Sequence, residues 1–207
     1  MSSTIAIFPL NLVVFPGSVY PLHIFEERYK SLISICLESK KGFGIVLKTK
    51  DDIVKVGCIV EISKVIKKYN DGKYDIVVHG LERYYILNTF IHPEGYFLAK
   101  IESYSDTPGE MDQSLYKEIK GKFLSILEKI NVKLEPAFFN NLESTKHKSF
   151  KIAEKCGLRI DQQQELIVLK NENKRLYFLK DHLEHLDQYI DENKVLKEII
   201  LGDGYIN

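Results

Sequence analysis

The chain lacks paired cysteines, an excess of charge of either sign, and a long uninterrupted hydrophobic run. Its three cysteines, Cys36, Cys58 and Cys156, are odd in number and far apart, and none belongs to a Cys-x-x-Cys pair. This spacing excludes a disulfide framework and the common zinc-binding patterns. We therefore expect three buried free thiols, as in proteins of a reducing compartment.

Charge is balanced, because 29 lysine and arginine residues face 29 aspartate and glutamate residues. A strong nucleic-acid binder usually carries a large positive field, which this composition does not supply. The local exception is a small basic group of Lys64, Lys67 and Lys68 beside Tyr69. Lysines at a strand end are typical of a charged sheet edge that discourages aggregation, and RNA binding is the alternative.

The first apolar stretch is interrupted by Pro9, Asn11, Pro16 and Gly17, and no basic segment precedes it. We therefore expect neither a signal peptide nor a membrane span, and the default is a cytoplasmic protein. Hydrophobic residues make up 44% of the chain, which is enough for a folded core and argues against disorder.

Up to about Tyr104 the pattern predicts short strands with turn residues between them. Asn70-Asp71-Gly72 predicts a hairpin turn, because Asn and Gly tolerate positive φ. One helix is expected at Glu26–Glu38, with a buried face of Tyr29, Leu32, Ile33 and Cys36. The expected strands are Ile5–Ile7, Gly44–Lys48, Val60–Tyr69, Lys73–Val78, Leu81–Asn88 and Phe97–Ser103.

After a polar linker at Ser105–Glu110 the period becomes helical. We expect a helix start at Pro136, a helix at Phe150–Cys156 ended by Gly157, and an N-cap at Asp161 with Gln164 completing its box. Between the linker and Pro136, a further helical segment is expected to carry one apolar stripe: Leu115, Ile119, Phe123, Ile126 and Ile130.

A single long helix is predicted from Leu166 to Ile190, about 37 Å in length. It carries leucines at alternating steps of three and four, which favours a bundle helix and leaves a self-associating coiled coil as the alternative. We expect the tail from Leu201 to be loose. The leucine stripe comprises Leu176, Leu179, Leu183, Leu186 and Ile190.

Three sequence blocks resemble the amino-terminal, substrate-binding domain of ATP-dependent Lon proteases. The resemblance implies a bacterial protein. The first runs from Phe8-Pro9-Leu10 through Phe15-Pro16-Gly17 to Pro21-Leu22. The second joins Val56-Gly57 and Asp71-Gly72-Lys73-Tyr74 to His79-Gly80-Leu81-Glu82-Arg83. The third and weaker block is the helical segment that contains Phe150–Glu154 and the leucine stripe.

The resemblance implies an α+β fold with a PUA-like β-barrel or pseudobarrel domain and one inserted helix, followed by an α-helical bundle. The order of strands and then helices predicts the same two-part architecture independently. We expect domains at residues 1–105 and 111–200 and a flexible tail at 201–207.

The sequence contains no Gly-x-x-x-x-Gly-Lys-Ser/Thr phosphate-binding loop, and it ends at Asn207 before an ATPase or Ser-Lys peptidase segment. We therefore expect no enzymatic activity and no cofactor. His182 and His185 lie three residues apart, but no third ligand accompanies them, so a solvated helix face is expected rather than a metal site.

The resemblance implies a non-catalytic protein that recognises unfolded or disordered polypeptide segments, acting as a substrate-recognition or adaptor protein. Such recognition uses exposed aromatic side chains and sheet edges, and the candidates are Phe15, Tyr20, Phe25 and Tyr29, although large aromatics are often simply core. The alternatives are RNA binding by a PUA-like barrel, and regulation of a full-length Lon protease by pairing with its helical segment. A monomer or weak dimer is expected.

Overall fold

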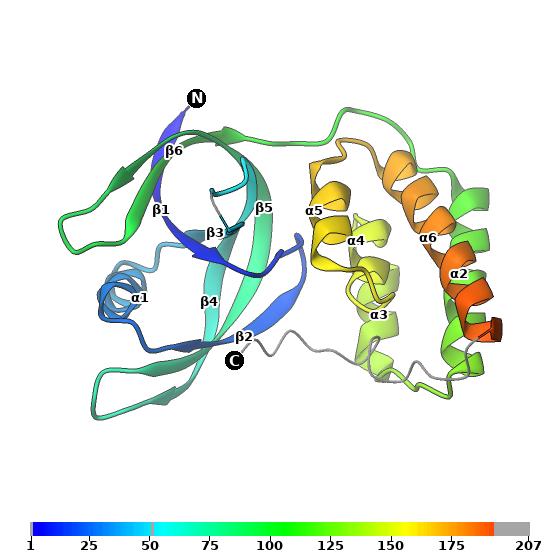
Figure 1. The fold of residues 1–207 in the computed structure, drawn as a ribbon, viewed down its shortest axis with the longest axis horizontal. Helices are drawn as coiled ribbons and strands as arrows, with labels where there is room; N and C mark the ends of the chain where they lie inside the picture. Colours follow the sequence, from blue (N-terminus) through cyan, green and yellow to red (C-terminus); the bar gives the residue numbers. More distant parts are fainter. Residues whose placement is uncertain (1, 51, 193–207) are drawn as a thin grey trace. The chain divides into compact units, whose positions relative to one another are not determined.

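A computed structural model describes residues 2–50 and 52–192 of the chain (Figure 1). The chain divides after Ser105 into two compact units. We call residues 2–105 the strand unit and residues 106–192 the helical unit, and each is described by itself. Together they give the α+β class expected from the sequence. The tail predicted from Leu201 lies outside the described residues, and the domain limits 1–105 and 111–200 stay a prediction.

The strand unit holds six strands in the order β2-β5-β4-β3-β1-β6, and β5 also pairs with β6. Five strands therefore form a closed ring of pairings, namely β1, β3, β4, β5 and β6. Strand β2 pairs with the first part of β5. The β1–β3 pair is parallel and the other pairs are antiparallel. The strands are β1 Ser3–Leu10, β2 Val19–Ile24, β3 Phe43–Leu47, β4 Val56–Lys68, β5 Tyr74–Ile91 and β6 Phe97–Ser103.

The expected hairpin joins β4 to β5, with Gly72 at φ 82° in its turn. Two expected strands prove to be one, because β5 continues through Gly80. At this position the backbone before β2 crosses the sheet closely: a Cβ on Gly80 would lie 2.3 Å from the Phe15 carbonyl oxygen. The glycine therefore permits the close approach that brings β2 alongside β5.

Strand β2 was not predicted, because Pro21 interrupts its apolar pattern and weakens a strand assignment. Helix α1, Glu27–Ser39, buries the four side chains expected from helical spacing. One of them, Tyr29, stacks on Phe8 of β1 with ring centroids 3.7 Å apart, so α1 closes one side of the strand core.

The helical unit contains five helices among its described residues, and the expected stripe on α2 is buried. Pro136 occupies the first turn of α3, as expected, and Gly157 after α4 has φ 72°. Leu176, Leu179 and Leu183 of α6 are fully buried, whereas Leu186 and Ile190 are half-buried. The helices are α2 Gln113–Lys129, α3 Pro136–Ser144, α4 Lys148–Ala153, α5 Ile160–Val168 and α6 Glu172–Glu192.

Three expectations for this unit were wrong. Helix α4 ends at Ala153 with Glu154 as its C-cap, three residues before the predicted end at Cys156, so Gly157 is not its stop. The N-cap of α5 is Arg159 rather than Asp161, and its backbone N–H donates to the Gln162 side-chain oxygen at 3.0 Å.

The long helix is broken, since α5 ends at Val168 and α6 begins at Glu172. At the break, the carbonyl oxygen of Leu169 accepts a hydrogen bond from the Arg175 guanidinium at 2.6 Å, and Asn171 Oδ1 accepts from the Lys174 N–H at 3.1 Å at the start of α6.

All three cysteines are buried free thiols, as predicted. Burial raises the pKa of Cys36 to about 11 and the pKa of Cys58 and Cys156 to about 12. Within the described part of the chain, each helix is too short or too polar to cross a membrane.

Candidate functional site

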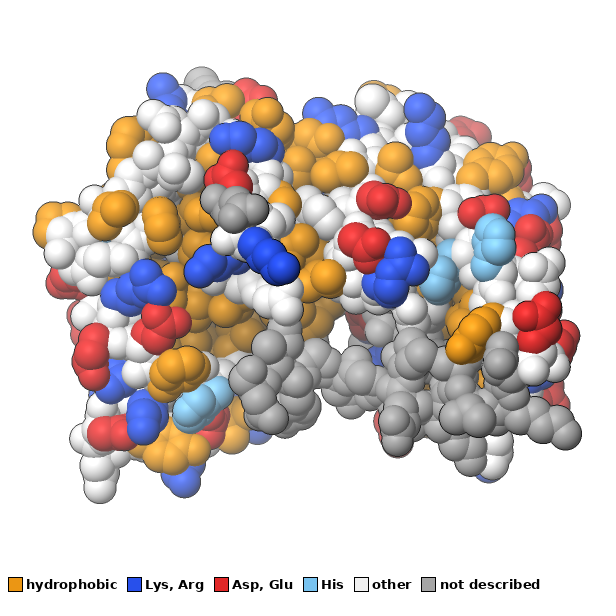
Figure 2. All heavy atoms as spheres, viewed as in Figure 1, with side chains coloured by type: hydrophobic (Ala, Val, Ile, Leu, Met, Phe, Trp, Pro, Cys, Tyr) orange, Lys and Arg blue, Asp and Glu red, His pale blue; other side chains and the backbone are white. Residues whose placement is uncertain are grey.

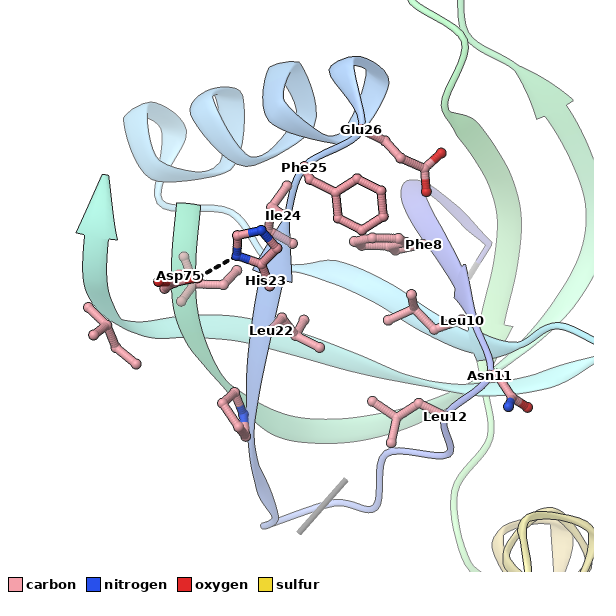
Figure 3. A pocket seen from close by; sticks show the side chains of 13 residues that line it. Phe8, Leu10, Asn11, Leu12, Leu22, His23, Ile24, Phe25, Glu26 and Asp75 are labelled. Carbon is pink, nitrogen blue, oxygen red and sulfur yellow. Dashed lines mark hydrogen bonds and ion pairs between the residues drawn. The ribbon is translucent and has the colours of Figure 1, made fainter. Parts of the chain in front are cut away.

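An apolar hollow of about 650 Å³ lies in the strand unit between the end of β1 and strand β2 (Figure 3). Figure 2 shows apolar side chains gathered in a depression of this unit, with charged groups around it. Apolar residues dominate the lining, which contains neither lysine nor arginine. The lining residues are Phe8, Leu10, Asn11, Leu12, Pro21, Leu22, His23, Ile24, Phe25, Glu26, Ile66, Asp75 and Ile76.

The hollow exists because two strand edges stand opposite one another without pairing. Strand β6 pairs with β1 only from Ser3 to Ile7, so the last three residues of β1 extend beyond it. Strand β2 is the end strand of the sheet and has β5 as its one neighbour among the described strands. The space between these edges is therefore lined by side chains and is not bridged by strand pairing.

Phe25 is the most exposed aromatic side chain of the lining, with 58% of its surface accessible. It lies between the end of β2 and the first turn of α1, where the chain turns from strand to helix. Its ring is 6.0 Å from the His23 ring, in a stacked arrangement. An exposed phenylalanine at the margin of an apolar hollow is suited to contact a partner, because burying it removes apolar surface from water.

Three polar residues of the lining, His23, Glu26 and Asp75, already have partners within the strand unit. His23 Nδ1 lies 2.6 Å from Asp75 Oδ1, and the Tyr69 hydroxyl donates to Asp75 Oδ2 at 2.7 Å. These two hydrogen bonds lower the pKa of Asp75, with the His23 bond as the larger cause. Glu26 accepts a hydrogen bond from the Arg28 guanidinium at 2.7 Å. The lining therefore offers apolar contact more than free charge.

The four aromatic residues predicted as a binding set do not lie together on the surface. Phe15 and Tyr29 are buried in the core, with 1% and 2% of their surfaces accessible, so their interpretation as contact residues is corrected. Tyr20 is half-buried and packs against the core. Phe25 alone of the four lines the hollow.

Sequence reasoning did not identify the aliphatic part of the lining. Leu10, Leu12 and Leu22 are ordinary core residues by composition, and nothing in their spacing marks a cavity. A usable signal was present in Pro9 and Pro21, because proline favours the ends or edges of strands and both lie on the two strands that border the hollow.

The two other groups considered from sequence do not form a second hollow. Lys64, Lys67 and Lys68 are exposed near the end of β4, and the Lys67 ammonium lies 4.3 Å from the Tyr69 ring centroid. His182 Nε2 donates to the Cys156 carbonyl oxygen at 2.7 Å, whereas His185 is exposed. These two histidines therefore have different surroundings and do not share a ligand site.

The helical unit contains a cluster that resembles a metal site in composition. One ligand atom each from Asp106, His147 and Glu172 lie within 4.8 Å of one another. The buried Arg175 guanidinium occupies their centre: it donates to both Asp106 oxygens at 2.8 and 2.6 Å and to Glu172 Oε2 at 2.7 Å. A fixed cation thus already neutralises both carboxylates, and we interpret the cluster as structural.

Comparison with known proteins matches residues 4–185 to the family described as the ATP-dependent protease La (LON) substrate-binding domain. The Lon proteases of Buchnera aphidicola and Vibrio parahaemolyticus are 25% and 27% identical to the chain, each over 195 residues and 87% of its length. These matches cover 25% and 24% of the two proteases, so the chain spans about a quarter of the length of these curated relatives.

Two solved structures share the fold. The Lon N-terminal domain protein from Xanthomonas campestris gives a TM-score of 0.66 at 21% identity, covering 86% of this chain and 98% of that one. The N-terminal domain of the Mycobacterium avium complex Lon protease gives 0.69 at 17% identity, covering 88% and 98%.

Proposed function

Since the chain belongs to the Lon substrate-binding domain family, we propose that it binds unfolded or disordered polypeptide segments through the hollow between β1 and β2. The observation that carries this proposal is the exposed Phe25 at the margin of an apolar cavity. The hollow lies in the size range of binding cavities, and about 650 Å³ accommodates a few apolar side chains. Folded proteins bury such side chains, so the hollow selects segments that expose them.

The proposed role is non-catalytic recognition, in a substrate-recognition or adaptor protein. The lining contains no serine, threonine, cysteine or lysine that could act as a nucleophile, and Glu26 and Asp75 are each held by a partner. A role in the cytoplasm is a further part of the proposal, whereas pairing with a full-length Lon protease is an alternative to it.

The test measures binding of fluorescent peptides that tile a permanently unfolded, reduced and alkylated protein. We expect apolar peptides to bind the wild-type chain, and Phe25→Ala to weaken the tightest of them about 10-fold, a loss of about 1–2 kcal/mol. Phe90→Ala is the matched control, because Phe90 is 47% exposed on β5 and does not line the hollow. Equal affinity of both variants and the wild type would contradict the proposal.

Salt dependence separates this function from RNA binding at Lys64, Lys67 and Lys68. A complex driven by phosphate contacts loses affinity steeply as salt rises, whereas apolar peptide binding changes little. RNA binding that is abolished by replacing the three lysines with glutamine, in a chain that binds no peptide, would favour the RNA alternative.

A further inference from the structure

Strand β2 has a free edge with a defined set of backbone groups. The Ser18 carbonyl oxygen accepts a hydrogen bond from the Gly80 N–H at 2.9 Å, so the backbone of residue 18 faces β5. Backbone groups alternate in direction along an antiparallel strand, so Tyr20, Leu22 and Ile24 also face β5. The backbone groups of Val19, Pro21 and His23 therefore face outward. On that side, the described part of the chain has no strand.

The opposite border of the hollow has the same kind of edge. The Leu10 carbonyl oxygen accepts from the Lys48 N–H at 2.8 Å, so residue 10 faces β3 and Pro9 faces away from it. Pairing with β6 has already ended at Ile7. Each border thus carries one proline in an outward position, which has no N–H to donate. Prolines at such positions weaken edge-to-edge aggregation.

The edge of β2 nevertheless retains five hydrogen-bonding groups. They are the N–H groups of Val19 and His23 and the carbonyl oxygens of Val19, Pro21 and His23. The hollow touches four consecutive residues of β2, Pro21–Ile24. A surface on one face of a strand contacts alternate residues, so contact with consecutive residues indicates that the hollow follows the edge.

We infer that the bound polypeptide adds to β2 as an extra strand, hydrogen-bonded to Val19, Pro21 and His23, with alternate apolar side chains in the hollow. This inference rests on the proposed function and specifies its ligand: an extended segment of about five residues with apolar side chains at every second position. Strand addition supplies affinity through the backbone and selectivity through alternate side chains. A segment of this length spans about 17 Å, comparable with β2 itself.

The experiment uses the full chain and the tightest peptide found with the wild-type protein. Two peptide series are made, each N-methylated at every second residue, so that one series loses the N–H groups facing β2 and the other loses those facing away. We expect one series to bind about 10- to 100-fold more weakly than the parent and the other to bind within about 3-fold of it. An equal effect of both series, while Phe25→Ala still weakens the parent peptide, would overturn strand addition and leave the proposed function standing.

Amide hydrogen exchange gives an independent readout on the protein. Binding should slow exchange at Val19 and His23, while Tyr20 and Leu22, which face β5, should change little. Unchanged exchange at Val19 and His23 in a saturated complex would also overturn the inference. So would concentration-dependent protection of these two amides without peptide, because a second copy of the chain would then occupy the edge. Absence of binding by every peptide would instead remove the proposed function, and strand addition with it.

Discussion

The hollow of the strand unit and the Arg175 cluster of the helical unit each bring together residues of the kinds found in functional sites. They differ in how many of those residues already have partners within the chain. In the cluster, Arg175 is fully buried and its carboxylate partners Asp106 and Glu172 are hydrogen-bonded to it. In the hollow, Phe25 is exposed and the outer edge of β2 has no strand partner among the described residues. Titratable groups in close contact therefore already have their partners here, whereas the unfilled apolar space beside an unpaired strand edge is where we propose binding.

The substitution with the largest expected effect on this comparison is Arg175→Met. It removes the cation and leaves two carboxylates in partly buried positions. We expect a loss of about 3–5 kcal/mol in the free energy of unfolding, because an uncompensated buried charge is costly. Urea unfolding measures this loss. Lys180→Met, on the same helix, removes an exposed pair with Glu118 and should cost about 0–1 kcal/mol. Equal losses in the two variants would show that the cluster is not a central stabilising element.

Lowering the pH should reduce the contribution of the same cluster to the free energy of unfolding, because Glu172 has a lowered pKa in the folded state. Burial alone raises the pKa of Glu172, but hydrogen bonds from Ser149 and Arg175, with the charge of Arg175, outweigh it and the pKa is lowered. Glu172 therefore stabilises the folded state above its unfolded pKa of about 4.3, and this contribution is lost as the pH falls through the lowered folded value. We expect the stability difference between the wild type and Glu172→Gln to shrink in that window.

Glu154 supplies a control of opposite sign for the acid experiment. Burial raises its pKa, despite opposition from Lys151, so the ionised form destabilises the folded state. Relative to Glu154→Gln, the wild type should gain stability as the pH falls through the raised folded pKa toward the unfolded value. Urea unfolding at a series of pH values measures both differences. The same trend for Glu154 and Glu172 would contradict this account.

The substitution with the smallest expected effect tests the outer edge of β2, which borders the hollow. Pro21→Val restores an N–H on the outer edge of β2 and adds one possible hydrogen bond to a guest strand. We expect peptide affinity to rise about 3-fold and self-association to increase, measured by fluorescence anisotropy and light scattering. Val19→Thr is a control that changes a side chain on this strand and keeps the backbone donors. A loss of affinity in Pro21→Val with an intact fold would argue against a guest strand at this edge.

Elements with strong local patterns could be predicted from the sequence. Helical spacing gave the buried face of α1, and Asn70-Asp71-Gly72 gave the β4–β5 turn, because each depends on neighbouring residues. The break between α5 and α6 was not predicted, although Asn171, whose Oδ1 accepts from the Lys174 N–H at 3.1 Å, is of a residue type that favours a helix N-terminus. Strand β2 was missed because Pro21 is unfavourable in a strand unless the strand is known to be an edge.

The candidate site was predicted only in part. Phe25 was named as one of the aromatic residues around the proline-rich start, but Phe15 and Tyr29 carry the same aromatic signal and are core residues. Burial depends on which strands pair, and the sequence pattern does not show that β1 and β2 stand apart. The hollow is a property of two unpaired edges, so it becomes visible only when the strand order is known.

The burial of Cys36, Cys58 and Cys156 has a practical consequence for observing this molecule. Their raised pKa values, about 11 to 12, leave almost no thiolate at neutral pH, and their side chains are inaccessible to alkylating reagents while the chain is folded. A cysteine introduced on the surface, for example by Val19→Cys beside the hollow, would therefore react selectively with a maleimide dye. The natural chain is thus ready for single-site fluorescent labelling without removal of its own cysteines.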